Sequence, residues 1–229
     1  MNGQQDWEAA NAALDMQGWA LLPKLIDART CAKLRELYET EIFRSTMVMA
    51  RHGFGKGEYK YFSYPLPEPI AELRPTLYAQ LAPLANRWAA LRQEEVTYPA
   101  AHADFLARCH QAGQARPTPL LLKYGPGDYN CLHQDLYGEH VFPLQVAILL
   151  SAPSKDFTGG EFVMTEQRPR AQSRASVVPL DQGDGVVFAV NRRPVQGKRG
   201  TYTVQHRHGV SALVTGERYT AGIIFHDAQ

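Results

Sequence analysis

Hydrophobic positions along the chain follow two patterns, which meet near residue 117. Before residue 117 apolar residues mostly recur at helical spacing, and after it they form short runs separated by turn residues. Helical spacing predicts helices that bury one face, whereas short runs bounded by turns predict strands. No internal repeat or low-complexity linker divides the chain. We therefore expect one α+β domain over residues 1–229, with a mainly helical portion, 1–117, packed on a β core, 118–229.

The first portion contains four helix candidates and one early strand. Asp27 is a suitable N-cap for the second helix, and the apolar residues that follow it lie on one face. Pro75 and Pro83 fall inside the third helix, where each removes a backbone hydrogen bond, so we expect kinks or breaks there. The predicted helices are 6–16, 27–44, 69–93 and 100–112, and the strand is 18–25, broken by Pro23.

The second portion alternates short apolar runs with turn signals, such as Gly-Pro-Gly at 125–127 and Gly-Gly at 159–160. Many short strands at such spacing are typical of a β-sandwich, barrel or jelly roll. A further short strand is expected after the first of these turns, near residue 133. The other predicted strands are 120–124, 144–150, 161–165, 176–180, 186–190, 201–205 and 218–225.

Between the first two long helices, residues 51–64 read RHGFGKGEYKYFSY and interleave cations with aromatic rings. Three glycines make the first half of this segment pliable. One interpretation is a substrate flap, in which rings such as those of Tyr59 and Tyr61 stack on a polyanionic ligand held by the cations. The other interpretation is an ordinary hairpin that covers one face of a sheet.

Composition narrows the class of protein without naming a partner. Hydrophobic residues make up 45% of the 229 residues, charged residues 21%, and the net charge is +1, which is ordinary for a globular domain. No apolar run approaches the ~20 residues that span a bilayer, and the N-terminus lacks a signal-peptide pattern. Cys31, Cys109 and Cys131 show no paired spacing, which indicates a reducing compartment. We expect a cytoplasmic protein with no membrane partner.

Two His-x-Asp pairs are candidate metal ligands. His102-x-Asp104 lies in a predicted helix, where residues two apart point to nearly opposite sides. His133-x-Asp135 lies in a predicted strand, where residues two apart share a face at about 6.6–7 Å between α-carbons. Only the second pair is therefore expected to bind one ion.

A later histidine would complete two imidazoles and one carboxylate, a set that leaves positions open on the metal and suits non-haem Fe(II). His208 precedes Arg218 by ten residues, and Arg218 begins an apolar strand. An arginine turned into such a core needs an anionic partner, for which a dicarboxylate co-substrate is suitable. Geometry alone leaves the choice of histidine open, and the spacing to Arg218 favours His208. The histidines downstream of the pair are His140, His206, His208 and His226.

The order His133-x-Asp135, His208, Arg218 resembles that of the Fe(II)/2-oxoglutarate-dependent oxygenases, whose core is a double-stranded β-helix of the jelly-roll, cupin-like kind. The segments Gly159-Gly160-Glu161-Phe162 and Gly185-Val186-Val187-Phe188 are similar to two strands of that core. The resemblance covers roughly 118–226. It implies Fe(II) on the two histidines and the aspartate, and 2-oxoglutarate on Arg218. With O₂, such an enzyme hydroxylates or oxidatively demethylates its substrate and releases succinate and CO₂.

Within that superfamily, Tyr124-Gly-Pro-Gly followed by Leu132-His-Gln-Asp resembles the AlkB-like nucleic-acid dealkylases and the bacterial oxygenases named for damaged nucleic acid. The resemblance implies that Tyr124 contacts 2-oxoglutarate and that alkylated nucleic acid is the leading substrate. Leu122 and Ile224 depart from the AlkB pattern, which has polar residues there. The prolyl-hydroxylase-like branch shares the distal His-to-Arg spacing, so a protein or small-molecule hydroxylase is the alternative.

Basic residues gather between 168 and 207, where eight cations stand against Asp181 and Asp184, a net +6. A basic rim favours a phosphate-rich partner such as nucleic acid, and we take Arg192 and Arg193 as candidate substrate residues with Tyr59 and Tyr61. Two solvated loops, or a metal- or nucleic-acid-binding β module without turnover, are the alternatives. The basic residues are Arg168, Arg170, Arg174, Arg192, Arg193, Lys198, Arg199 and Arg207.

Overall fold

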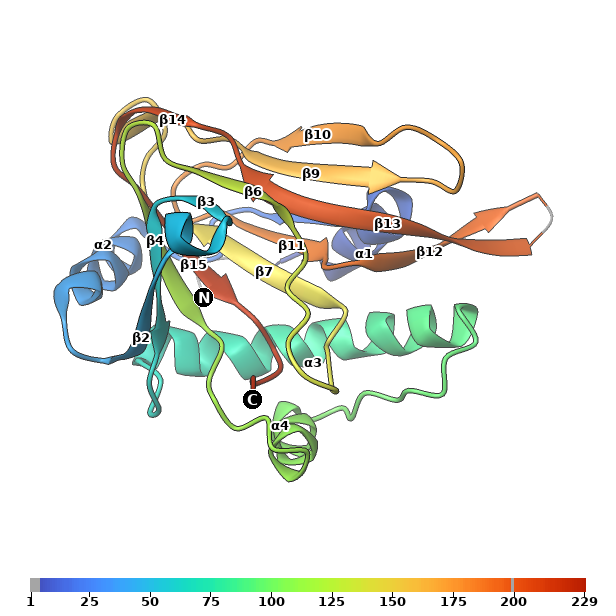
Figure 1. Ribbon diagram of the computed structural model, residues 1–229. Coiled ribbons are helices and arrows are strands. Elements are labelled where there is room, and N and C mark those ends of the chain that lie inside the picture. The colour runs from blue at the N-terminus through green and yellow to red at the C-terminus, as the bar shows by residue number, and fades with distance from the viewer. Residues whose placement is uncertain (1–4, 199) are drawn as a thin grey trace.

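The computed structural model describes residues 5–198 and 200–229 of the chain (Figure 1). Its helices are α1 (Trp7–Gln17), α2 (Ala28–Glu36), α3 (Glu68–Leu91) and α4 (His102–Gln111), with 3-10 turns η1 (Leu37–Glu39) and η2 (Met49–His52). Its strands are β1 (Trp19–Leu22), β2 (Phe43–Val48), β3 (Gly55–Lys56), β4 (Glu58–Phe62), β5 (Leu120–Tyr124), β6 (Tyr129–His133), β7 (Leu144–Leu149), β8 (Phe157–Gly159), β9 (Phe162–Gln167), β10 (Arg174–Val178), β11 (Gly185–Ala189), β12 (Arg192–Gly197), β13 (Gly200–Val210), β14 (Leu213–Gly216) and β15 (Arg218–Ile223).

Two antiparallel sheets face each other (Figure 1). The larger has seven strands in the order β1-β11-β7-β15-β5-β4-β2, and the other has six, of which five run β10-β9-β13-β6-β3 and β12 pairs with β13. A two-stranded sheet, β14-β8, lies at one end. The strand runs of the second half therefore form the layered β core that the turn spacing predicts, and the α+β class is confirmed.

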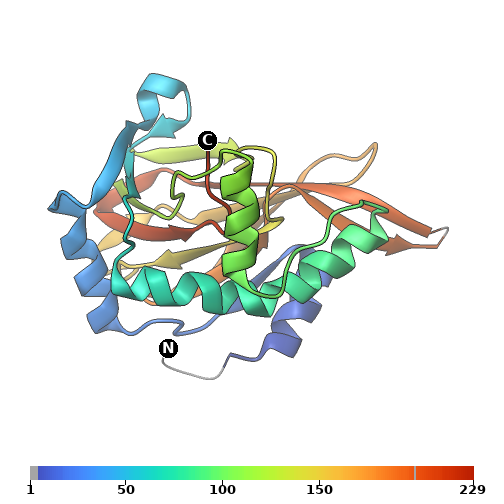
Figure 2. The same cartoon turned by 90° about the horizontal axis from the view of Figure 1, so that it is seen from below.

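Helices α3 and α4 cover the face of the seven-stranded sheet that points away from the other sheet (Figures 1 and 2). The largest apolar cluster fills this layer, with Leu77 and Tyr78 of α3 packed among β7 residues such as Val146 and Ile148. Burying these side chains is the main source of stability for such a layer. Among the described residues no helix is long and apolar enough to cross a membrane.

Pro75 and Pro83 lie within α3, yet the helix continues through both. The helix does not break, and Figure 2 shows that its axis bends along its length, which agrees with the expected kinks rather than with the expected breaks. Each proline removes one backbone hydrogen bond, but the apolar face of α3 is buried from Ile70 to Ala89. Packing of that face outweighs the lost bonds.

The helix predicted over 27–44 ends at Glu36, and Phe43–Val48 forms strand β2. The expected helix is therefore too long. Strand β2 pairs with β4, and Phe43 stacks on Phe62 at 4.8 Å between ring centroids. This pairing overrides the helical spacing of the apolar residues, because burial against a neighbouring strand is stronger than local periodicity.

Residues 51–64 are built into both sheets. Strand β4 lies between β5 and β2 in the larger sheet, and β3 pairs with β6 of the smaller one. The segment is neither a separate flap nor a hairpin laid over a sheet, and both interpretations are corrected. It joins the two layers at one end of the space between them.

The basic residues between 168 and 207 lie in strands as well as in loops, which corrects the expectation of two solvated loops. Arg192 and Arg193 belong to β12, which pairs with β13 along its length, and Arg207 lies within β13. Arg174 begins β10. The expectation for Arg199 lies outside the described residues.

Arg74 ties α3 to the end of the chain. Arg74 is 1% exposed, and its guanidinium binds Asp227 Oδ1 at 2.8 Å and donates to the backbone carbonyl of Ile224 at 2.8 Å. Tyr64 and His110 also bind the Asp227 carboxylate, each at 2.8–2.9 Å. The charges are thus fully paired in a buried position.

We expect Arg74→Ala to lower the free energy of unfolding by about 3–5 kcal/mol, because it leaves the buried Asp227 carboxylate uncompensated. Denaturant unfolding followed by circular dichroism measures the loss. The control is Arg87→Ala, whose partner Asp15 is exposed and which should cost no more than about 1 kcal/mol. Equal losses in the two variants would contradict the prediction.

Candidate metal centre

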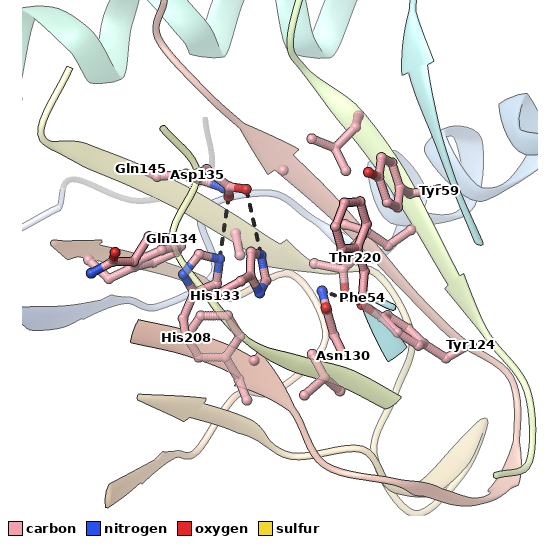
Figure 3. A pocket seen from close by; sticks show the side chains of 18 of the residues that line it. Phe54, Tyr59, Tyr124, Asn130, His133, Gln134, Asp135, Gln145, His208 and Thr220 are labelled. Carbon is pink, nitrogen blue, oxygen red and sulfur yellow. Dashed lines mark hydrogen bonds and ion pairs between the residues drawn. The ribbon is translucent and has the colours of Figure 1, made fainter. Parts of the chain in front are cut away.

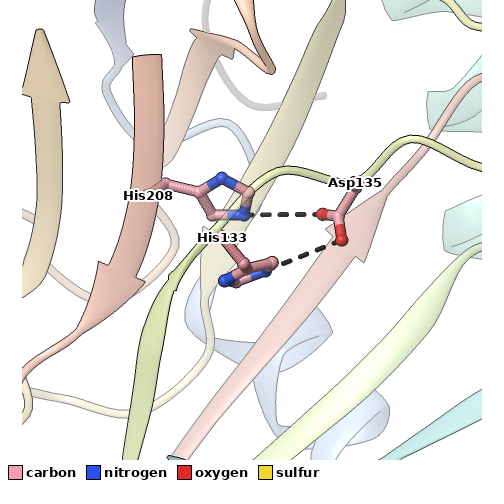
Figure 4. A group of neighbouring side chains, drawn as sticks. All are labelled: His133, Asp135 and His208. Carbon is pink, nitrogen blue, oxygen red and sulfur yellow. Dashed lines mark ion pairs between the residues drawn. The ribbon is translucent and has the colours of Figure 1, made fainter. Parts of the chain in front are cut away.

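The side chains of His133, Asp135 and His208 converge on one point (Figure 4). One potential ligand atom from each lies within 4.8 Å of the others, and no other such group occurs in the described part of the chain. His133 ends β6, and pairing of β6 with β13 sets His208 directly opposite it. The two ring centroids are 4.2 Å apart. Asp135 lies just past the end of β6 rather than within the strand, yet it still reaches the same point.

Further contacts with neighbouring groups orient the imidazoles of His133 and His208. His133 Nδ1 lies 2.7 Å from the carbonyl oxygen of Cys131, so Nδ1 donates its hydrogen there and Nε2 is left as the acceptor. His208 packs against Phe188 at 4.6 Å between centroids, and its Nε2 lies 3.4 Å from Asp135 Oδ2. Burial and the nearby His133 lower the pKa of His208, which keeps its ring neutral. Neutral imidazole with a free Nε2 is the form that binds a metal.

Asp135 is 7% exposed and carries the negative charge of the group. Burial raises the pKa of its carboxyl, but interactions with His208 and His133 and the hydrogen bond from Tyr137 lower it by more, so the pKa lies well below the ordinary value. The carboxylate therefore remains ionised. Two imidazoles and one carboxylate match the donor set of non-haem Fe(II) sites, which leaves further positions open.

Arg218 and Tyr124 lie on neighbouring strands close to the triad. The pairing of β15 with β5 sets them opposite each other, and the guanidinium carbon is 5.6 Å from the Tyr124 ring centroid. Arg218 is 1% exposed and donates to Thr220 Oγ1 at 2.6 Å, while its buried Nε has no partner. It forms no ion pair with any described acid. Burial lowers its pKa to about 10, which still leaves the guanidinium charged at neutral pH.

A cavity of about 200 Å³ connects these groups (Figure 3). The triad lies on its wall together with Tyr124 and Arg218. Apolar and aromatic side chains form most of the remaining lining, including Leu122, Phe162 and Val210. The cavity lies between the two sheets, where a ligand would be shielded from water while a buried cation and a metal ligand set face it.

Comparisons with known proteins agree with this geometry. The family model described as "Oxygenase, catalysing oxidative methylation of damaged DNA" matches residues 57–228. The chain belongs to this oxygenase family. Two proteins from Mycobacterium tuberculosis, strains CDC 1551 / Oshkosh and ATCC 25618 / H37Rv, are each 53% identical to it over 167 residues. That match covers 73% of this chain and 72% of each relative, both of which are named as uncharacterised.

Solved structures share the fold of this oxygenase. A prolyl-4-hydroxylase from Pseudomonas putida has a TM-score of 0.57 and 15% identity, covering 97% of this chain and 99% of that one. A 2OG-Fe(II) oxygenase family oxidoreductase from Burkholderia pseudomallei has a TM-score of 0.55 and 16% identity, covering 100% and 94%. These likenesses confirm the expected double-stranded β-helix core with N-terminal helices.

Besides the triad and Arg218, four other residues that the sequence singled out line the cavity of the oxygenase, and a fifth lies behind its wall. Tyr124, Tyr59 and Tyr61 line it, the last two from β4. Arg192 is exposed at the start of β12 and is not among the residues that line this cavity. Leu122 lines the cavity, and Ile224 packs beside Tyr61 behind its wall.

Arg193 does not face the substrate side, which corrects its interpretation as a substrate residue. It is 1% exposed and binds Glu166 Oε2 at 2.5 Å. Its Nε donates to His206 Nε2 at 3.2 Å, and it also binds the carbonyl oxygen of Asp15. The same Glu166 carboxylate binds Arg168 at 3.1 Å. Arg193, which was expected on the basic surface, is therefore part of a buried ion pair.

The other candidate histidines have structural partners. His206 accepts from Arg193, and His226 Nδ1 accepts from the Phe142 backbone N–H at 3.3 Å. His140 is half-buried in the loop after β6 and lines a different cavity. None of them joins the triad. His208 is the histidine that lies opposite His133, as its spacing to Arg218 predicts.

Sequence reasoning missed several residues that line the cavity. Tyr137 binds Asp135, Asn130 donates to the Tyr124 hydroxyl at 3.4 Å, and Gln145 is buried on β7 with its amide oxygen unpaired. Phe54, one of the rings that the sequence placed in the 51–64 segment, reaches the cavity from the turn before β3. The sequence could have indicated Tyr137, since it lies two residues after the predicted ligand Asp135. Gln145 carried one local signal, because it is the single polar residue of an otherwise apolar strand.

His102, from the rejected pair, is 6% exposed, and its Nε2 lies 2.7 Å from the Phe225 carbonyl oxygen. Burial lowers its pKa to about 4, with Arg74 contributing. The unfolded chain takes up this proton near pH 6.5 and the folded chain only near pH 4. The stability that neutral His102 contributes is therefore complete above pH 6.5 and is lost as the pH falls towards 4.

We expect wild type to lose roughly 2 kcal/mol more unfolding free energy between pH 7 and pH 5 than His102→Gln does. Glutamine keeps an N–H donor for the Phe225 carbonyl but does not titrate. Urea unfolding of both proteins at the two pH values measures the difference. Parallel losses would show that His102 does not carry this pH dependence.

Proposed function

We propose that this oxygenase binds Fe(II) through His133, Asp135 and His208 and uses 2-oxoglutarate and O₂ to oxidise alkyl groups on damaged nucleic acid. One observation carries the cofactor part. Arg218 is a buried, charged guanidinium without an acid partner among the described residues, and it faces the cavity that holds the triad. Such a cation requires an anion, and the far carboxylate of 2-oxoglutarate supplies one.

In this proposal each group of residues that lines the cavity has a separate role. The triad holds the metal, and Arg218 pairs with the far carboxylate of the co-substrate beside the Tyr124 hydroxyl. When bound, Fe(II), 2-oxoglutarate and O₂ supply the oxidising chemistry that protein side chains lack. The apolar wall around Leu122 excludes water. An N-methyl group that is hydroxylated in this cavity is released as formaldehyde, which leaves the free amine.

The substrate part rests on the mouth of the cavity and on the family description. Phe54 is 46% exposed, lines the cavity, and stacks on His52 at 5.3 Å between centroids. Arg51 and Lys56 flank it, and neither forms an ion pair with a described residue. Aromatic faces beside free cations are suited to a nucleotide, whose base stacks and whose phosphate is anionic. Inside the cavity, the unpaired Gln145 oxygen could accept an N–H of a base.

The basic hairpins offer a second contact region. The β12–β13 hairpin extends beyond the sheets (Figure 1), and Arg170, Lys198 and Arg207 are exposed on this hairpin and the neighbouring β9–β10 connection. They would contact phosphates farther along the strand. This contribution should weaken with salt, since it comes from displaced counterions.

Hydroxylation of a protein is the alternative, and the fold shared with prolyl hydroxylases supports it only at the level of architecture. The two substrates differ in what the cavity mouth must bind. A peptide does not need the free cations around Phe54, whereas a nucleic-acid strand does.

We expect Arg218→Met to weaken 2-oxoglutarate binding about 10- to 150-fold, because charge-assisted bonds worth about 1.5–3 kcal/mol are lost. Metal affinity should be unchanged. Anaerobic titration of the Fe(II) protein with 2-oxoglutarate, followed by the visible charge-transfer band of the chelate, measures this. Arg192→Met is the matched control, since it removes an arginine outside the cavity. Absence of the band in wild type, or its persistence in His133→Ala, would refute the cofactor assignment.

We expect methylated oligonucleotides to stimulate release of succinate and formaldehyde, and Phe54→Ala to raise their KM about 5- to 150-fold, the value of one lost base stack of about 1–3 kcal/mol. Met16→Ala, which removes an exposed side chain of α1, is the control. Stimulation by proline-containing peptides, with none by oligonucleotides, would favour the protein hydroxylase instead.

A further inference from the structure

A chain of two tyrosine hydroxyls connects one cavity wall to a metal ligand. The Tyr137 hydroxyl donates to Asp135 Oδ1 at 2.8 Å and accepts from the Tyr61 hydroxyl at 3.4 Å. Tyr137 lies on the loop that joins β6 to β7, and Tyr61 lies on β4. Their hydrogen bonds therefore connect β4, in the larger sheet, to the Asp135 carboxylate, which follows β6 of the smaller sheet.

Tyr61 is itself part of the wall that a substrate would touch. It lines the cavity beside Tyr59, whose ring meets it edge-on at 5.3 Å between centroids. The guanidinium of Arg44, on β2, lies 4.4 Å from the Tyr61 ring centroid. Leu120 and Ile224 pack against the same ring cluster. The position of the Tyr61 hydroxyl thus depends on how this wall is packed.

We propose that Tyr61 and Tyr137 are positioning residues that couple the substrate wall of the cavity to metal binding by Asp135. This inference rests on the proposed function, because it assumes that the triad holds a metal. Neither tyrosine is assigned a bond to the metal or to the reacting atoms.

The physical basis of the proposal is that the two oxygens of the Asp135 carboxylate have different contacts. Tyr137 uses a lone pair of Oδ1, which also lies 3.6 Å from His133 Nε2. Oδ2 lies 3.4 Å from His208 Nε2 and receives no hydroxyl donor from a described residue. The bond to Oδ1 fixes the rotation of the carboxylate and directs Oδ2 towards the metal. Removing such a supporting partner typically weakens metal affinity 10- to 100-fold.

The contribution of Tyr61 passes through Tyr137. A hydroxyl that accepts one hydrogen bond becomes a stronger donor in the next, so Tyr61 strengthens the bond of Tyr137 to Asp135. The Tyr61–Tyr137 distance of 3.4 Å is long for a bond between hydroxyls. A ligand that presses on the Tyr59–Tyr61 wall can shorten or break it, and so alters how firmly Asp135 is held.

The test compares Tyr137→Phe, Tyr61→Phe and the double variant with wild type. Tyr78→Phe is the matched control, because the buried Tyr78 does not line the cavity and also loses one hydroxyl bond, to the Pro99 carbonyl at 2.8 Å. Anaerobic titration with Co(II) alone gives the metal affinity and the visible spectrum of the bound ion. Thermal unfolding of the metal-free proteins separates metal effects from loss of stability.

We expect Tyr137→Phe to weaken Co(II) binding about 10- to 100-fold and to change the visible spectrum. Tyr61→Phe should weaken binding by a smaller factor, the double variant should match Tyr137→Phe, and Tyr78→Phe should bind as wild type does. Unchanged affinity in Tyr137→Phe would overturn the proposal, and an additive effect of Tyr61→Phe in the double variant would overturn the hydroxyl chain. Wild type that binds no Co(II), or binds it equally in His133→Ala, would instead refute the proposed function.

Discussion

The antiparallel pairing of β6 with β13 is the constraint on which the site depends. It sets His133 opposite His208, and it brings Asp135 to the same point just after β6 ends. A slip of one residue in this register would turn one imidazole to the outer face of the sheet. The facing sheet applies a similar constraint, because pairing of β15 with β5 sets Arg218 opposite Tyr124. Two registers, one in each sheet, thus aim both halves of the site into one cavity.

Three buried arginines differ in the partners that the structure gives them. Arg74 and Arg193 are each 1% exposed, and each has a carboxylate partner, Asp227 and Glu166 respectively. Arg218 is equally buried, but in the described part of the chain no carboxylate lies within ion-pair distance of it, and its contacts include the Thr220 hydroxyl and the rings of Tyr124 and Phe157. Burial of a charge without a counter-charge is costly. Arg218 carries this cost beside the triad, and the proposed binding of 2-oxoglutarate rests on that difference.

The sequence predicted the triad and Arg218 because chemistry and strand spacing agree there, whereas features set by distant contacts escaped it. The helix predicted through Ile42 ends at Glu36, since strand β4, which is later in the chain, pairs with β2. Arg193 was taken for a surface cation because its partner Glu166 is 27 residues away. Arg193 stands next to the exposed Arg192 in β12, and the local sequence does not distinguish a surface arginine from one that is buried against a distant carboxylate.

Residues 51–64 illustrate how such long-range pairing changes a functional interpretation. The aromatic and basic character of the segment was evident in the sequence, but β3 and β4 bind it to different sheets. A wall fixed in this way cannot swing open as a lid does. Its rings can respond to a ligand only through small shifts in packing, and the hydroxyl of Tyr61 is the point where such a shift reaches the triad, by way of Tyr137. Sensitivity to the substrate would then come from a rigid wall and a weak hydrogen bond rather than from a mobile loop.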